Sequence, residues 1–188
     1  PFDPNRNIYF FFMRLFGRSI VKSAGIALRV EGKENLNFSQ PHIFISNHAS
    51  MMDIPCVLAG IPQLVGFVYK KELHWIPSLG MALKWGKIHI PIHRQKGMSA
   101  MESLDQAANA VKTGQSVLLF AEGTRTKDGN LQPFKRGAFY MAVRAGVPVV
   151  PLTINGTFPI LPKQSFHIQP GNVSLHIGKP IYLNGETG

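Results

Sequence analysis

Carboxylates are scarce in this sequence of 188 residues. Twenty Lys and Arg stand against ten Asp and Glu, which gives a formal net charge of +10. Between Glu34 and Glu102 only Asp53 and Glu72 are acidic. A chain this basic favours anionic partners, which can be phosphorylated ligands, nucleic acid or an anionic membrane. Charge alone does not choose among them, and it also fits a soluble protein that is merely basic.

The sequence has only one cysteine and no long hydrophobic run. The single cysteine, Cys56, excludes an internal disulfide, which fits a reducing compartment or a protein that needs no bridges. It lies in the apolar run of a predicted helix, so we interpret it as a core residue rather than a nucleophile. No apolar run approaches the roughly 20 residues that span a bilayer, and no signal-peptide pattern is visible. The sequence starts at Pro1 and does not decide whether a spanning segment precedes it.

Common signatures of phosphate, dinucleotide and metal sites are also incomplete. The segment GMALKWGKI has one residue too many for a P-loop, and Ile stands where Ser or Thr belongs. There is no G-x-G-x-x-G, and no G-x-S triplet extends to G-x-S-x-G. His89 and His93 can share one face of a strand, but no cysteine or acid cluster completes a zinc site. We therefore predict no metal ligands.

Residues 5–28 are predicted to form an amphipathic helix. Arg14, Arg18 and Lys22 recur every four residues as a basic stripe, beside a broad apolar remainder that contains the run YFFF. Such a helix suits a membrane interface, but it also fits an ordinary helix packed on its own domain. The aromatic cluster favours the membrane, so we assign residues 1–26 to a membrane-interface helix.

Strand and helix patterns alternate along the remainder, which predicts an α/β fold. The segment SVLLF is wholly apolar, as expected inside a parallel sheet, whereas Pro91 places the strand KIHIPIHR at an edge or a bulge. No linker-like segment divides residues 27–188, so we predict one domain with a largely parallel or mixed central sheet flanked by helices. Further strands are expected in ALRVEG, HIFISN, LVGFVYK, VPVVPLTI, SFHIQP and VSLHIG, and helices near residues 53–60, 72–86, 98–113 and 134–146.

Three polar clusters follow predicted strands at their carboxyl ends. Asn47 and His48 follow HIFIS, Arg94 follows KIHIPIH, and residues 121–125 (AEGTR) follow SVLLF. In open α/β sheets, ligands bind beyond the carboxyl ends of the strands. If the three strands are parallel, we expect the three clusters to share one cleft.

The segment SNHASMMD places His48 and Asp53 five residues apart. An imidazole can act as a general base near neutral pH, and a carboxylate can fix its tautomer and stabilise the imidazolium. Residues five apart on a helix point about 140° apart, so the pair works only if His48 lies before the helix. Ser50-x-x-Asp53 matches a capping box, and Pro55 suits a helix start. The pattern therefore supports both a proton-transfer pair and a carboxylate that merely caps.

The segment FAEGTRTKDG is predicted to be a loop between a strand and a helix. Glu122, Gly123 and Thr124 combine a carboxylate, backbone freedom and a hydroxyl. Arg125 adds a charge suited to bidentate phosphate binding. A solvated turn is the alternative interpretation.

Together these segments resemble the sequence blocks of the glycerolipid acyltransferases, in the lysophosphatidic acid acyltransferase branch. NHASMMD fits N-H-x-x-x-x-D, IHIPIHR stands for a strand that ends in an arginine, and FAEGTR stands for F-P-E-G-T-R. KKELHWIPSLG resembles the segment after the first block, and VPVVPLTING the fourth block, with Pro151 at its proline. Order and spacing agree from about residue 27 to 181. One block is weak evidence, but four in order are strong.

The sequence departs from the family pattern at three positions. Ala121 replaces the usual proline before Glu122, which is expected to loosen the turn. His93 replaces an acid before Arg94, and Pro91 replaces an aromatic residue. These changes bear on acceptor specificity more than on reaction class, and the loss of the acid leaves Arg94 freer for phosphate.

The resemblance implies transfer of a fatty acyl group from acyl-CoA or acyl carrier protein to the free hydroxyl of lysophosphatidic acid, which gives phosphatidic acid. His48 is then the general base, and Asp53 orients it. No cofactor is required, and residues 27–188 form the acyltransferase domain. By resemblance, the acceptor is held by five residues, and the two arginines among them contact its phosphate: Arg94, Glu122, Gly123, Thr124 and Arg125. Lys70 and Lys71 add positive field.

The resemblance also implies an enzyme associated with a membrane phospholipid surface, with its active site on the cytoplasmic side and no nucleic-acid partner. One alternative is a relative with another acceptor, which is another lysophospholipid, glycerol 3-phosphate or an ornithine lipid. A second alternative is a lipid-binding domain that has lost its catalytic activity, but the intact His48 and Asp53 argue against it. A third is a nucleic-acid-binding module, for which no stacking motif or recognition helix stands out.

Overall fold

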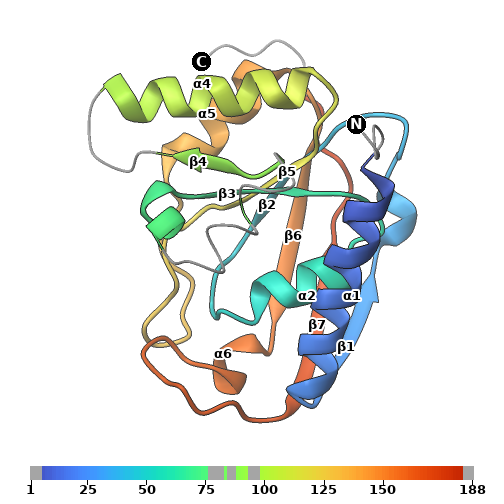
Figure 1. Cartoon of the computed structure of the whole chain (residues 1–188). Helices are drawn as coiled ribbons and strands as arrows, with labels where there is room; N and C mark the ends of the chain where they lie inside the picture. Colours follow the sequence, from blue (N-terminus) through green and yellow to red (C-terminus); the bar gives the residue numbers. More distant parts are fainter. Residues whose placement is uncertain (1–5, 76–82, 84–87, 93–97, 184–188) are drawn as a thin grey trace.

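A seven-stranded sheet with helices on both faces is formed by the residues that the computed structural model describes, 6–75, 83, 88–92 and 98–183 (Figure 1). The strands are β1 (Ile26–Glu31), β2 (Ile43–Ser46), β3 (Gly66–Lys70), β4 (Ile90–Ile92), β5 (Val117–Phe120), β6 (Val149–Asn155) and β7 (Gly171–Ile177). Their order across the sheet is β1-β7-β6-β2-β5-β3-β4. All neighbours are parallel except β6 and β7, so β7 and β1 run against the other five. The predicted α/β domain with a mixed central sheet is confirmed.

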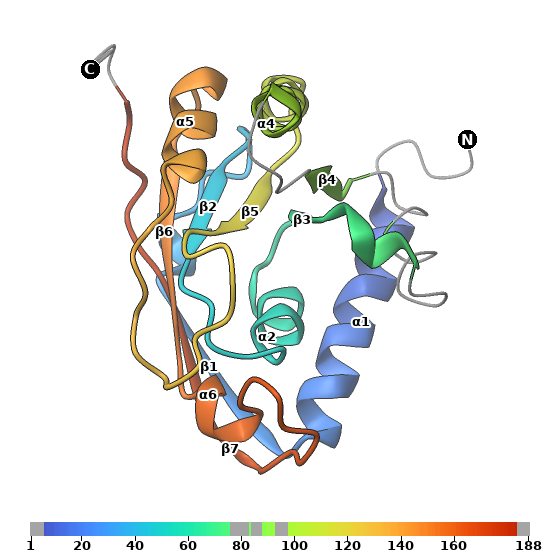
Figure 2. The same cartoon turned by 90° about the vertical axis from the view of Figure 1, so that its left-hand side faces the viewer.

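The helices divide between the two faces of the sheet (Figure 2). They are α1 (Asn7–Ser23) and α2 (Asp53–Gly60) on one face, α4 (Met98–Lys112) and α5 (Arg136–Ala145) on the other, and the short α6 (Thr157–Ile160) after β6. Two 3₁₀ turns span Lys33–Asn35 and Lys71–Trp75.

Because both faces are covered, the central strands are apolar throughout rather than alternating. In β2, Phe44 belongs to the hydrophobic cluster under α1 and α2, while Ile43 and Ile45 belong to the cluster under α4 and α5. All three side chains are buried. This burial fixes the position of β2, and so the place where the chain leaves the sheet at Asn47.

Two predicted elements are wrong in part or in whole. The first helix, expected to reach residue 28, ends at Ser23, because Gly25 takes a left-handed φ of 65° and Ile26 begins β1. The strand expected in SFHIQP is absent, and residues 165–170 form an irregular loop instead. Alternation of polar and apolar side chains does not produce a strand where no neighbouring strand is available to pair with it. Helix α6 was not predicted, because four residues that include Pro159 show no periodicity.

The position of β4 confirms the interpretation of Pro91. β4 is the last strand of the sheet, where a missing N–H interrupts no second ladder. Of the helix expected over residues 72–86, the described parts are the 3₁₀ turn Lys71–Trp75 and Leu83, which is helical. The rest of that prediction lies outside the described residues, as do His93 and Arg94.

Candidate active site

The carboxyl ends of β2 and β5 bring two of the three predicted polar clusters together. The two strands are parallel neighbours. The backbone N–H of His48, just beyond β2, donates to Oε1 of Glu122, just beyond β5, at 2.6 Å. The N–H of Thr126 donates to the His48 carbonyl at 3.0 Å. The expected shared edge is therefore confirmed for these two clusters, whereas Arg94, the third, lies outside the described residues.

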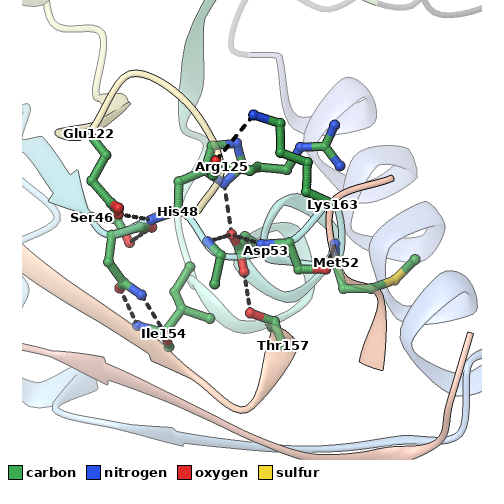
Figure 3. Close-up of polar contacts among 12 residues, drawn as sticks. Ser46, His48, Met52, Asp53, Glu122, Arg125, Ile154, Thr157 and Lys163 are labelled. Carbon is green, nitrogen blue, oxygen red and sulfur yellow. Dashed lines mark hydrogen bonds and ion pairs between the residues drawn. The ribbon is translucent and has the colours of Figure 1, made fainter. Parts of the chain in front are cut away.

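His48 and Asp53 lie within hydrogen-bond reach of each other (Figure 3). Nδ1 of the imidazole is 2.8 Å from Oδ2 of the carboxylate. Asp53 is fully buried, while 15% of the His48 side chain is exposed. Because a carboxylate only accepts, Nδ1 carries the proton of the neutral ring and donates it to Asp53. Nε2 is thereby left unprotonated and able to act as a base.

The buried Asp53 carboxylate is held by four donors. Besides the His48 ring, Oδ2 accepts from the N–H groups of Ala49 and Ser50 at 2.8 and 2.9 Å. Oδ1 accepts from the Thr157 hydroxyl at 2.5 Å. A buried carboxylate is costly unless its oxygens are hydrogen-bonded. These donors supply that compensation and fix the direction in which the carboxylate meets the imidazole.

The two interpretations of SNHASMMD are compatible. Helix α2 begins at Asp53, so His48 lies in the turn before it, as a pair five residues apart requires. The Ser50 N–H donates to Asp53, which is one half of a capping box. The Ser50 hydroxyl accepts from the Met52 N–H at 3.1 Å and donates to the Leu161 carbonyl at 2.8 Å. The Asp53 carboxylate therefore braces the turn that leads into α2 and orients the imidazole at once.

Contacts from neighbouring strands confine the imidazole further. The Phe120 ring, at the end of β5, stacks on the His48 ring with centroids 3.7 Å apart and an interplanar angle of 11°. The Asn47 side-chain amide exchanges two hydrogen bonds of 2.8 Å with the backbone of Ile154 in β6. Sequence reasoning missed Phe120 and Thr157: the first is hidden in an apolar strand, and nothing local links Thr157 to a carboxylate 104 residues away.

Glu122 holds the site together from within the protein. Its side chain is buried, and Oε1 and Oε2 accept from the backbone N–H groups of His48 and Gln132, at 2.6 and 2.9 Å. Both oxygens are thus engaged by the chain itself. The expected loosening of the turn at Ala121 is offset, because the Ala121 N–H donates to the Ser46 carbonyl at 2.9 Å, a bond that a proline cannot make.

The loop after β5 also brings cations together. Gly123 adopts a left-handed φ of 68°, and a Cβ there would lie 2.9 Å from the Lys135 side chain. Lys163, which sequence reasoning missed, donates from Nζ to the Thr124 hydroxyl at 3.2 Å and to the Arg125 carbonyl at 3.4 Å (Figure 3). Among the described residues, neither Lys163 nor Arg125 forms an ion pair with a carboxylate. Two unneutralised cations, one from the loop after β5 and one from the loop between α6 and β7, therefore lie close together beside His48.

The two lysines predicted to add positive field lie at the carboxyl end of β3 and just after it. Lys70, at the carboxyl end of β3, pairs with Glu72 at 3.6 Å, so part of its positive field is neutralised. Lys71 is exposed in the following 3₁₀ turn. Within the described ranges, no three His, Cys, Asp or Glu side chains gather as metal ligands. Burial raises the pKa of the Cys56 thiol to about 12, which fits its interpretation as a core residue.

Comparisons with known proteins agree with the sequence blocks. A family model described as Acyltransferase matches residues 27–155. The chain is 39% identical over 183 residues to the 1-acyl-sn-glycerol-3-phosphate acyltransferase BAT2, chloroplastic, of Brassica napus. It is 32% identical over 164 residues to the 1-acyl-sn-glycerol-3-phosphate acyltransferase alpha of Homo sapiens. These matches cover 96% and 87% of this chain but 53% and 58% of those proteins, so the chain spans about half the length of the curated relatives it matches.

A solved structure of an acyltransferase has a similar fold. The crystal structure of the 1-acyl-sn-glycerophosphate acyltransferase PlsC from Thermotoga maritima superposes with a TM-score of 0.83 at 30% sequence identity. The match covers 97% of this chain and 73% of that chain. The family resemblance predicted from the four sequence blocks is confirmed.

Proposed function

The chain belongs to the acyltransferase family, and on this premise we propose that it transfers a fatty acyl group from acyl-CoA or acyl carrier protein to the free hydroxyl of lysophosphatidic acid. The observation that carries the proposal is the His48–Asp53 pair. A buried, fully hydrogen-bonded carboxylate 2.8 Å from Nδ1 leaves Nε2 as a base at the edge of the sheet where ligands of α/β proteins bind. The relatives named above acylate 1-acyl-sn-glycerol 3-phosphate, as their names state.

In the proposed reaction, Nε2 of His48 takes the proton of the acceptor hydroxyl as that oxygen attacks the thioester carbonyl carbon. Asp53 stabilises the imidazolium that forms. The tetrahedral oxyanion then collapses, the carbon–sulfur bond breaks, and the proton passes from the imidazolium to the departing thiolate. The ester is the product and the His48 base is regenerated, so the cycle involves no covalent enzyme intermediate.

The acceptor phosphate is assigned to the cationic side of the site. Arg125 is half-buried and has a guanidinium suited to two phosphate oxygens. Arg94 is proposed as a second phosphate contact, on the strength of the sequence block alone. Gly123 and Thr124 shape the loop against the acceptor, while Lys70 and Lys71 add positive field. The contacts of Glu122 support a positioning role toward the His48 backbone rather than a direct bond to substrate.

Helix α1 is the proposed contact with the phospholipid surface. Arg18 and Lys22 border its outer face and are exposed. None of the described helices is both long and apolar enough to cross a bilayer, and a helix of this kind suits the plane of the interface. The cytoplasmic placement of the active site stays a prediction. The apolar part of the outer face consists of five exposed side chains: Ile8, Phe11, Phe12, Leu15 and Phe16.

The proposal is tested by incubating the purified protein with labelled acyl-CoA or acyl carrier protein and a panel of acceptors. We expect labelled phosphatidic acid with lysophosphatidic acid as acceptor. Faster acylation of another lysophospholipid, glycerol 3-phosphate or an ornithine lipid would keep the reaction class and replace the acceptor. Absence of transfer to every acceptor, in a folded preparation that binds vesicles, would overturn the function.

A further inference from the structure

The loop between α6 and β7, residues 161–170, presents hydrophobic side chains to solvent. Phe166 is 100% exposed, and Ile168 is 44% exposed. Leaving a phenylalanine ring in water is unfavourable relative to burying it, so an exposed ring that adjoins a wider apolar surface is a candidate contact outside the chain. The loop is not a strand.

The α6–β7 loop lies beside the C-terminal half of α1 (Figure 2). Ile168 and Pro170 line a groove of about 620 Å³ together with Phe16 and Ile20 of α1. A Cβ on Gly25, just after α1, would lie 2.8 Å from Pro170, so the two segments are in close approach. The apolar face of α1 therefore does not stop at Phe16 but continues across the groove onto the loop.

The charges of α1 and of the α6–β7 loop indicate which kind of partner binds the apolar surface that the two segments form together. Residues 7–23 contain Arg14, Arg18 and Lys22 and no acid, and residues 161–170 contain Lys163 and no acid. A protein partner would need acidic groups around an apolar centre, whereas an anionic lipid surface offers negative headgroups above an apolar interior. Exposed Phe and Ile flanked by Lys and Arg match the second arrangement.

We propose that the α6–β7 loop inserts Phe166 and Ile168 into an anionic lipid bilayer as a second anchor beside α1. The inference rests on the lipid substrates of the proposed function and goes beyond it by adding a second contact. Two anchors fix the tilt of the domain on the membrane, which one helix cannot do. The same loop carries Lys163, whose Nζ contacts Thr124 and the Arg125 carbonyl. Docking of the loop therefore holds the cationic side of the site near the headgroups.

The test measures vesicle binding without any acyl donor or acceptor. Phe166→Ser and Ile168→Ser are compared with Phe139→Ser, a partly exposed aromatic on α5 at the opposite face. On phosphatidylcholine vesicles with added phosphatidylglycerol, we expect Phe166→Ser to lower the partition coefficient roughly ten-fold, because a buried phenylalanine ring is lost. Phe139→Ser should bind like the unmodified chain.

A second readout locates the ring directly. In Phe166→Trp, indole emission measured against the unmodified chain should shift to the blue on vesicles and be quenched by brominated acyl chains. With a short-chain, water-soluble acceptor, Phe166→Ser should keep the turnover of the unmodified protein.

Several outcomes would overturn the loop anchor. One is equal vesicle binding by Phe166→Ser and Phe139→Ser together with no quenching in Phe166→Trp. Another is loss of self-association in Phe166→Ser at unchanged vesicle binding, which would identify a second copy of the chain as the occupant. Vesicle binding through Phe166 without any acyl transfer would instead reject the proposed function and leave the anchor standing.

Discussion

At the scale of single residues, the groups around His48 determine which of its two ring nitrogens is engaged. Asp53 accepts from Nδ1, and Phe120 stacks on one face of the ring. Thr157 and two backbone N–H groups hold the carboxylate in turn. Nδ1 is therefore engaged by Asp53, and Nε2 is the ring nitrogen that remains for general-base catalysis in the proposed reaction.

Replacing His48 removes that base. We expect His48→Ala to lower kcat about 10²–10⁴-fold, the usual contribution of a general base. Steady-state transfer assays measure the loss, and the thermal unfolding midpoint checks that the chain stays folded. His176→Ala, which changes an exposed histidine on β7, is the matched control and should keep full activity. A rate for His48→Ala equal to that of the unmodified chain would exclude the mechanism.

Lys163 offers a separate test of the cationic side of the site. We expect Lys163→Met to raise KM for lysophosphatidic acid about ten-fold with little change in kcat, since one charge-assisted contact is worth about 1.5 kcal/mol. Monoacylglycerol, which lacks the phosphate, should be used equally by both proteins. Lys163→Arg should restore KM, and the exposed Lys179→Met should leave it unchanged.

A different outcome would assign Lys163 another role. A fall in kcat for charged and neutral acceptors alike would mean that Lys163 serves the loop through Thr124 and Arg125, and not the phosphate.

At the scale of elements, α1 is tied to the β3–β4 edge of the sheet through His89. The Phe67 N–H donates to Nδ1 at 3.1 Å, so Nε2 carries the proton and donates to the Tyr9 hydroxyl 3.0 Å away. Burial lowers the pKa of His89 to about 4 and raises the pKa of Tyr9 to about 12. Both groups are therefore neutral near pH 7, and His89, considered above as a zinc ligand, instead docks the N-terminal helix.

This docking predicts a pH dependence of stability. In the unfolded chain His89 binds its proton near pH 6.5, but in the folded chain only near pH 4. As the pH falls through this window the unfolded state binds more protons, so the free energy of unfolding decreases, by at most about 3 kcal/mol. Chemical denaturation at several pH values should show a shallower decrease for His89→Asn than for the unmodified chain. An equal decrease would contradict the buried neutral imidazole, and His167→Asn serves as the control.

At the scale of the whole molecule, the net charge of +10 acts together with the apolar face of α1. In the proposed membrane contact, these charges attract the chain to an anionic surface over a distance of about 10 Å at 0.1 M salt. The exposed aromatic side chains are then expected to hold it there. Salt screens the long-range attraction but not the short-range insertion, so a salt titration separates the two contributions.

The partition coefficient on anionic vesicles should therefore fall as the salt concentration rises, and it should reach a plateau at a value above zero at high salt. Sedimentation with phosphatidylglycerol-containing vesicles at increasing sodium chloride measures the decline. Binding to duplex DNA should fall throughout the same range, because that contact has only the electrostatic component. Affinity for DNA that rivals the affinity for vesicles would restore the nucleic-acid interpretation.

Much of the architecture follows from the sequence because its cause is local. Wholly apolar runs such as SVLLF predict buried strands, and α2 lies where the pattern around Asp53 predicts. The family blocks also predicted which residues form the candidate site. Where the cause is not local the prediction failed, as at SFHIQP, whose alternating pattern found no partner strand.

The sequence by itself determined the α/β class, the basic surface and the candidate pair of His48 and Asp53. Only the tertiary structure decided that this pair is joined, because the deciding contacts come from distant segments. Thr157 reaches Asp53 from 104 residues away, and Glu122 holds the His48 backbone from 74 residues away. A capping carboxylate and an orienting carboxylate look identical in a local pattern. The fold shows that Asp53 binds both the turn and the imidazole, since it determines which donors surround the buried oxygens.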